Sequence, residues 1–260
     1  MLPALFVSHG APTVALEKDD YARALADFGA RTARPEAVIV VSAHWEAVGP
    51  VRVNTVDRPG LIYDFAGFPR EMYSLDYPAP GAPALAVEVL RRLGSAGVDA
   101  VAEAKRGWDH GVWVPLRLLY ADAAIPVLEI SLPVPRDPER LFRIGQALGP
   151  MRTRGALIVG SGGIVHNLSL LRWSGKEAAV DEWARAFDDW VNERLEGRVV
   201  EELLQYRLRA PHADLAVPTS EHFDPLFFVL GATSEGERPS PVFSGFQYGN
   251  LSMRTVAFGG

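Results

Sequence analysis

The sequence predicts an α/β fold with a central, mostly parallel sheet flanked by helices. Residues 36–45 (EAVIVVSAHW) form a continuous, β-branched apolar run, and similar runs occupy 5–9, 126–131 and 156–161. Strands buried on both faces of a parallel sheet have this composition, whereas a strand with one face in water would alternate. Helical patterns lie between the runs. In such sheets ligands bind beyond the carboxyl ends of the strands, where we expect the active site.

Three of these strands carry a histidine toward that edge. His9 follows the first run, His44 ends the second, and His166 lies in the glycine-rich loop SGGIVHN after the fourth. The run at 126–131 ends on serine instead. A lone histidine after a strand is usually structural, but three in register indicate one shared site.

Length and composition limit the possible functions. The chain has 260 residues and could form one domain or two; no break in composition favours two, so a single domain over 1–260 is expected. A net charge of −6 and the lack of a basic run interleaved with aromatics argue against nucleic-acid binding. Because there is no cysteine, any metal must be held by nitrogen and oxygen.

The first residues, MLPALFV, lack a basic region and a cleavage site, so they predict a strand rather than a signal peptide. No apolar stretch reaches the roughly 20 residues that cross a bilayer. We therefore expect no membrane association and a cytoplasmic location.

In the first half of the chain, residues 19–31 have the spacing of an amphipathic helix, which supplies the crossover to the strand of His44. Short strands are predicted at 51–54 and 61–65, separated by the turn DRPG. The stretch 63–80 is rich in aromatic residues, proline and glycine, which favours an ordered loop. Such loops are often lids or binding loops, although aromatics that only pin the loop to the core would look the same.

A helix is predicted at 83–93, with proline in its first turn and Gly94 as its stop. The segment GWDHGVWVP follows, ahead of a helical run at 116–120. In this segment Asp109 and His110 stand between glycines, so the backbone could approach a ligand closely. The competing interpretation is a structural histidine that caps the helix.

Further helices are predicted at 137–149, where Asp137 is the N-cap, and at 178–195 and 198–209. The final run at 252–258 alternates and predicts an edge or near-edge strand.

A Glu-His pair precedes the last predicted helix, which has Asp224 as N-cap and Pro225 at its first position. Together with His9 and His44, the pair Glu221 and His222 could form a site for a divalent first-row metal. Two histidines and a carboxylate suit non-haem Fe(II) that activates O₂, and three histidines also suit catalytic Zn²⁺. The choice of metal stays open at this point.

The chain resembles the class III (LigB-type) extradiol ring-cleavage dioxygenases, specifically their 4,5-DOPA dioxygenase-like branch. The matching segments span the whole chain in the expected order and are SHGAP (8–12), SAHW (42–45), DFAGFP (64–69), DHGVWVP (109–115), SGGIVHN (161–167) and PTSEHFDPL (218–226). Each segment is weak alone, but jointly they are specific.

The resemblance implies a single α/β domain that opens the ring of a catechol, DOPA-like or related, with O₂ and one divalent metal. Its metal ligands would be His9, His44 and His222, although the wider superfamily uses a glutamate as third ligand, which leaves Glu221 as the alternative. His166 would be the acid/base, with His110 near the substrate oxygens.

We also expect Tyr63, Asp109 and Trp113 to contact the substrate. Fe(II) is expected for turnover, because Zn²⁺ has no redox chemistry, while purified protein could carry Zn²⁺. A base is needed because catechol is protonated at neutral pH, where histidine can both accept and donate a proton.

Two other classes use the same residues. A Zn²⁺ hydrolase would use the three histidines to activate water and would need no O₂. A non-catalytic binding protein, like the cell-motility mediators of the MEMO type, would share the fold without dioxygenase activity. His212 matches none of the segments and is expected to be structural, on a surface turn.

Overall fold

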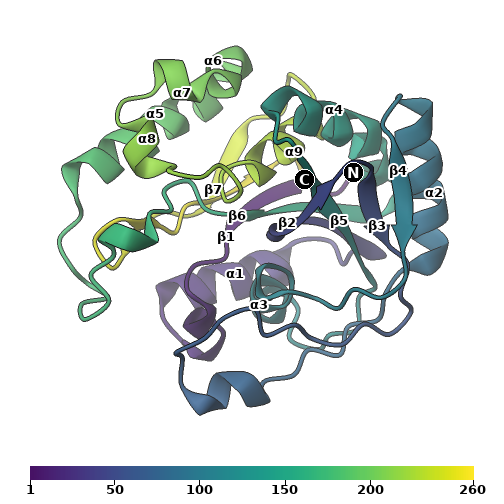
Figure 1. Ribbon diagram of the computed structural model, residues 1–260, viewed down its shortest axis with the longest axis horizontal. Coiled ribbons are helices and arrows are strands. Elements are labelled where there is room, and N and C mark those ends of the chain that lie inside the picture. The colour runs from purple at the N-terminus through teal and green to yellow at the C-terminus, as the bar shows by residue number, and fades with distance from the viewer.

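The computed structural model describes residues 1–260, and an eight-stranded sheet runs through its middle (Figure 1). The strands of the chain are β1 (Ala4–Ser8), β2 (Ala37–Val48), β3 (Val51–Asn54), β4 (Ala100–Glu103), β5 (Val127–Val134), β6 (Ala156–Gly162), β7 (Pro239–Phe243), β8 (Phe246–Gln247), β9 (Leu251–Ser252) and β10 (Thr255–Phe258).

The sheet has the order β4-β3-β5-β2-β6-β1-β10-β7, and β8 pairs only with β9. Its four central strands, β5, β2, β6 and β1, are parallel to one another. Outside them, β3 runs antiparallel to β5, and β10 antiparallel to β1. The predicted mostly parallel α/β sheet is therefore confirmed, and so is the near-edge strand at the end of the chain.

The α-helices are α1 (Asp20–Arg31), α2 (Pro83–Ser95), α3 (His110–Leu119), α4 (Pro138–Leu148), α5 (Glu182–Gly197), α6 (Val200–Leu204), α7 (Tyr206–Arg209), α8 (Ala213–Ala216) and α9 (Pro225–Gly231). Short 3₁₀ turns are η1 (Pro12–Leu16), η2 (Arg70–Ser74), η3 (Gly149–Arg154) and η4 (Leu168–Leu170). In Figure 1, α1 and α3 lie on one side of the sheet and α2, α4 and α9 on the other. None of the helices has both the length and the apolar character that a bilayer span needs.

Strand β2 shows why its sequence is a continuous apolar run. Val38 and Val40 pack in the core that includes α1 and α3, while Ile39 and Val41 pack in the core of α2, α4 and α9. All four side chains are fully buried. Burying one such side chain contributes about 1.5–3 kcal/mol, so both faces of the strand must be apolar.

The structure corrects the end of this strand. β2 continues past His44 to Val48, but its register with β5 shifts between Val41 and Glu46. His44 therefore lies in an irregular stretch of the strand rather than at its end. An irregular stretch turns a side chain away from the regular alternation of the strand, as bulges do next to active sites.

Other predicted boundaries were wrong. Residues 61–65 form no strand, since only Leu61 makes an isolated bridge. α3 starts at His110 rather than at residue 116, because residues 110–115, which were expected to lie in a loop, already form the start of the helix. α2 runs through Gly94 to Ser95, since a glycine weakens a helix by only about 1 kcal/mol.

In the C-terminal half, the helix predicted at 178–195 begins later, at Glu182, after a turn in which Ala178 bonds to Gly175. The helix predicted at 198–209 is divided into α6 and α7 at Gln205, whose backbone is not helical. Periodicity alone did not reveal either break.

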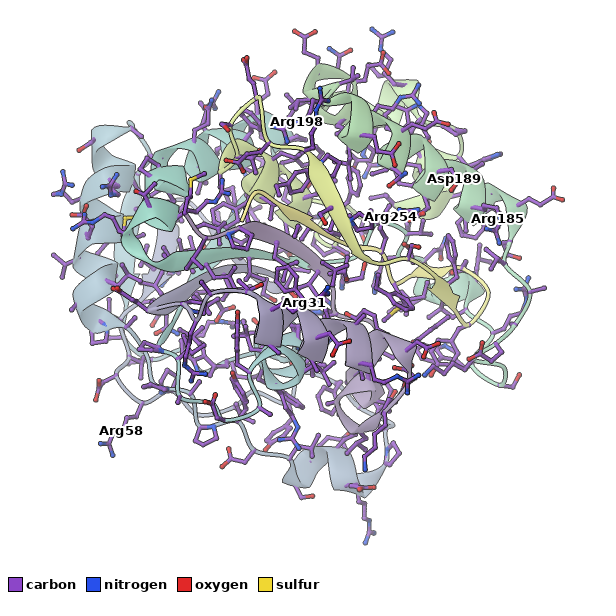
Figure 2. All side chains as sticks on the ribbon, turned by 180° about the vertical axis from the view of Figure 1, so that it is seen from behind. Arg31, Arg58, Arg185, Asp189, Arg198 and Arg254 are labelled. Atoms are coloured by element: carbon purple, nitrogen blue, oxygen red, sulfur yellow. The ribbon has the colours of Figure 1, made fainter.

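Arg254 ties the carboxyl end of β1 to helix α5. Its guanidinium lies 2.6 Å from Asp188 of α5, and its carbonyl accepts a 2.9 Å hydrogen bond from the Ser8 hydroxyl. Figure 2 shows Arg254 between the C-terminal strand and this helix, whereas Arg58 extends away from the molecule. The end of β1, which precedes His9, is therefore held in place through Arg254 and α5.

Candidate metal centre

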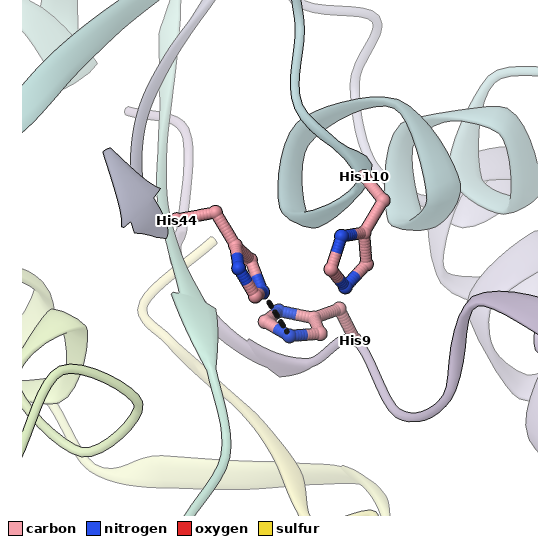
Figure 3. Close-up of side chains that lie close together, drawn as sticks. All are labelled: His9, His44 and His110. Carbon is pink, nitrogen blue, oxygen red and sulfur yellow. Dashed lines mark hydrogen bonds between the residues drawn. The ribbon is translucent and has the colours of Figure 1, made fainter. Parts of the chain in front are cut away.

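Five of the six histidines gather at the carboxyl edge of the central strands. The ring centroids of His9 and His44 lie 4.9 Å apart, and those of His222 lie 5.2 Å from His9 and 4.9 Å from His44. His110 also joins them, with its centroid 4.0 Å from that of His44. Figure 3 shows His9, His44 and His110 converging from a loop, a strand and a helix. The fifth is His166, which stacks on His222.

In the three expected ligands, Nδ1 faces an oxygen outside the cluster. The contacts are His9 Nδ1 to Ser161 Oγ at 3.0 Å, His44 Nδ1 to Asp64 Oδ2 at 3.5 Å, and His222 Nδ1 to Glu221 Oε1 at 3.2 Å. Carboxylates accept from these rings, and the Ser161 hydroxyl is itself a donor to the Gly111 carbonyl. The network therefore assigns the ring proton to Nδ1 in each case, which leaves Nε2 as a lone pair.

The lone pairs of His9 and His44 lie close together, with their Nε2 atoms 3.1 Å apart. His222 Nε2 is buried without a hydrogen-bond partner, in a ring whose centroid lies 5.2 Å from that of His9 and 4.9 Å from that of His44. Burial lowers the pKa of His44 to about 4 and those of His9 and His222 well below their usual value, so the rings are neutral near pH 7. Converging neutral imidazole nitrogens fit a divalent first-row metal.

His110 offers a further nitrogen. Ligand atoms of His9, His44 and His110 lie within 4.8 Å of one another, and those of His166, Glu221 and His222 form a second such group. His110 Nδ1 lies 3.0 Å from Asp64, and its backbone N–H donates to the same carboxylate. Burial raises the pKa of Asp64, but contact with His110 outweighs this effect and lowers the pKa to about 2. This carboxylate therefore orients both His44 and His110.

His166 lies directly against His222, with their rings stacked at 3.4 Å. Burial lowers the pKa of His166 to about 4, so it is a neutral proton acceptor near pH 7. Its backbone N–H donates to the Ala216 carbonyl at 2.9 Å, so the loop is tied down rather than free. Residue 162 must be a glycine, because a Cβ there would lie 2.0 Å from the His222 carbonyl oxygen.

The three residues expected to contact substrate do not line the cavity. Trp113 is fully buried and donates to the Ile62 carbonyl at 3.3 Å. Tyr63 donates to the Leu75 carbonyl at 2.8 Å. Asp109 is fully buried behind the histidines. In this structure the three side chains are engaged outside the cavity lining, and their contact with the substrate stays a prediction.

Asp109 belongs to a buried charged group that supports His44. It accepts from the Ser42 hydroxyl at 2.7 Å and lies 2.6 Å from the Arg106 guanidinium, which also donates to the His44 carbonyl at 3.1 Å. Glu129 lies 3.6 Å from Arg106, beyond hydrogen-bond distance. Burial, and then the charge of Asp109, raise the pKa of Glu129 well above its usual value, so it is neutral.

A cavity of about 660 Å³ opens in front of the five histidines. Asp64 is the one carboxylate in its lining. The apolar part of the lining consists mainly of Phe65, Phe68, Leu168, Trp173, Tyr248 and Leu251. Sequence reasoning did not single out Asp64, Trp173 or Tyr248; for Asp64 the available signal was an acidic residue inside an aromatic, glycine-containing loop. His212 lies on an exposed turn away from this cavity, as expected.

Residues 3–256 match the family described as the catalytic LigB subunit of aromatic ring-opening dioxygenase. The chain belongs to this family. It is 38% identical over 261 residues to the 4,5-DOPA dioxygenase extradiol of Escherichia coli K12, an alignment that covers 99% of this chain and 95% of that one. It is 36% identical to the protein of the same name from Beta vulgaris, over 97% of this chain and 95% of that one.

A crystal structure of an uncharacterized protein from Escherichia coli K12 has the same fold, with a TM-score of 0.84, 34% sequence identity and 100% coverage of both chains. The chain is therefore an extradiol dioxygenase, an oxidoreductase that incorporates both atoms of O₂. Enzymes of this family use a metal, and the histidine cluster provides a place for one.

Proposed function

We propose that this enzyme opens the ring of a catechol beside its two hydroxyl groups, with a metal bound by His9, His44 and His222. The observation that carries the proposal is that the Nδ1 atom of each ring faces an oxygen outside the cluster, while the Nε2 atoms of His9 and His44 lie 3.1 Å apart and that of His222 is buried without a partner. His222 is preferred to Glu221 as third ligand because its Nε2 is buried and unpartnered, whereas Glu221 binds Arg136 at 2.9 Å.

The metal would be Fe(II) during turnover, with Zn(II) as an alternative occupant of purified protein. A bound Fe(II) would accept both catechol oxygens and let electrons pass from the ring to O₂, which Zn(II) cannot do. Three neutral ligands leave the full charge of the cation in place, which favours an anionic catecholate over a neutral competitor.

His166 would take the proton from one catechol hydroxyl and return it to the ring-opened product. Its low pKa keeps it unprotonated near pH 7, which a base requires. His110 would face the substrate oxygens, held by Asp64 at 3.0 Å. The cavity would hold the ring over these side chains and exclude bulk water.

The substrate would be a dihydroxyphenyl compound related to DOPA, since relatives that match nearly the whole chain are named for 4,5-DOPA. O₂ is the second substrate. The aromatic lining of the cavity supports a flat ring as occupant.

The test is a panel of catechols mixed anaerobically with Fe(II)-loaded protein, followed by admission of O₂. We expect a yellow ring-opened product that forms only when both O₂ and Fe(II) are present. Activity that persists without O₂ would instead indicate a hydrolase. The absence of product from every catechol, with metal bound, would contradict the proposal and favour a binding protein.

A further inference from the structure

A row of four aromatic rings forms the wall of the cavity beyond the histidines. Phe65 and Phe68 meet edge to face with centroids 5.6 Å apart, Phe68 and Trp173 are 6.4 Å apart, and Trp173 and Tyr248 are 5.2 Å apart. The mouth of the cavity lies beside Trp173 and Leu168, which are 51% and 52% exposed. A ligand that reaches from the metal to the mouth would therefore lie along aromatic surface.

Tyr248 is held in this wall by an unusual backbone conformation. Its φ is +54°, in the left-handed region that a bulky side chain rarely adopts. Its backbone N–H donates to the Lys176 carbonyl at 2.8 Å, and its carbonyl accepts from the Arg172 N–H at 3.0 Å. Left-handed backbone costs on the order of 1 kcal/mol and concentrates at functional sites, which is consistent with a ring placed for binding.

The charged groups around the cavity disfavour a carboxylate on the substrate. No lysine or arginine lines it, and the single lining carboxylate, Asp64, is directed at His44 and His110. Arg70, two residues from Phe68, does not line the cavity, and the two cations closest in sequence to Trp173, one on each side of it, are engaged elsewhere. Lys176 binds both Glu17 and Asp19, and Arg172 binds Asp181. A carboxylate on the substrate would lose water along this wall without gaining a cation, which is costly.

We propose that the enzyme selects catechols that carry an uncharged apolar substituent, aryl or alkyl, over catechols that carry a carboxylate. This inference rests on the proposed function and narrows its substrate class to dihydroxyphenyl compounds that lack the carboxylate of DOPA itself. The volume of about 660 Å³ lies within the range of roughly 300–1,000 Å³ for sites that enclose drug-sized ligands, so there is room for a substituent besides the catechol ring.

The test measures binding separately from turnover. Zn(II)-loaded protein, which cannot oxidise the ring, is titrated calorimetrically with a phenyl-substituted catechol and with dihydroxyphenylacetate. We expect the phenylcatechol to bind at least about tenfold more tightly. Equal or tighter binding of the acid would overturn the inference, even if both compounds are cleaved by the Fe(II) enzyme. If neither compound binds, the proposed function fails together with the inference.

Variants at the mouth of the cavity sharpen the test. Trp173→Ala should weaken binding of the phenylcatechol by about tenfold and leave that of the acid nearly unchanged. Leu168→Arg adds a cation at the half-exposed mouth and should tighten binding of the acid by about threefold. Leu208→Arg, at a residue 87% exposed and outside the cavity lining, is the matched control for added charge. Equal gains from both arginine variants, or no effect of Trp173→Ala, would contradict the inference.

Discussion

The imidazole of His166 lies flat against that of His222, with ring centroids 3.4 Å and planes 8° apart. His222 is held on its other side by Glu221, at 3.2 Å from Nδ1. The proposed base is thus in contact with a proposed ligand but is not needed to position it. Binding of the metal and transfer of the proton can therefore be separated by mutation.

We expect His166→Ala to keep its metal and still bind catechol, because the substrate oxygens would bind the metal directly. Turnover should fall by about 10²- to 10⁴-fold, the usual contribution of a positioned proton-transfer group, and recover partly as pH rises, since hydroxide then ionises the catechol. His166→Phe keeps a ring against His222 without a proton acceptor, so it should lose the same activity. Loss of metal in proportion to activity in both variants would make His166 a ligand instead.

The ligand assignment predicts a graded loss of metal. His9→Ala, His44→Ala and His222→Gln should each abolish stoichiometric binding, measured by elemental analysis of dialysed protein. Glu221→Gln should weaken the affinity by only about 10- to 100-fold, because it replaces the charged acceptor that orients His222 with a neutral one. The control is His212→Ala, on an exposed turn. Should Glu221→Gln abolish binding while His222→Gln leaves it intact, the carboxylate is the ligand.

The metal-free protein should lose stability as pH falls from about 6.5 toward about 4. Burial lowers the pKa of His44 from 6.5 to about 4, so in this range the unfolded chain binds a proton that the folded chain does not. The free energy of unfolding then decreases by about 1 kcal/mol for each pH unit and each such histidine. Denaturant titrations of metal-free protein across this range measure the slope, and a flat profile would contradict neutral, buried rings.

Arg106, Asp109 and Glu129 lie behind His44, and substitutions of Arg106 and Glu129 should differ in their effect on the free energy of unfolding. Arg106→Met leaves the fully buried Asp109 without its cation and should lower the free energy of unfolding by about 3–5 kcal/mol. Glu129→Gln should change it by less than about 1 kcal/mol, because burial already keeps that carboxyl neutral. Chemical denaturation of both variants tests this, and equal destabilisation would mean that Glu129 is charged.

The central strands and their histidines could be predicted because both depend on local sequence. A run such as 36–41 must be buried on both faces whatever surrounds it, and parallel strands bring their carboxyl ends to one edge. His9 and His44 therefore meet at that edge as expected. Sequence also placed His222 on the segment that enters α9, where the structure has it.

The residues that line the cavity could not be predicted in the same way. Tyr63 and Phe65 lie two residues apart on a loop without periodicity, and only the fold decides that Phe65 lines the cavity while Tyr63 binds Leu75. Asp109 was singled out beside His110, but its burial against Ser42 of β2 depends on long-range packing. The contribution of Trp173 and Tyr248 likewise comes from segments that meet only in the folded chain.

An enzyme that opens a catechol ring as a dioxygenase places both atoms of one O₂ molecule in the product. The most direct measurement is mass spectrometry of the product formed by Fe(II)-loaded protein from a catechol and isotopically labelled O₂. We expect a ring-opened aldehyde-acid that carries both labelled atoms before exchange with water, and no such product from His44→Ala. An unlabelled product, a quinone, or a diacid from cleavage between the hydroxyls would contradict this expectation.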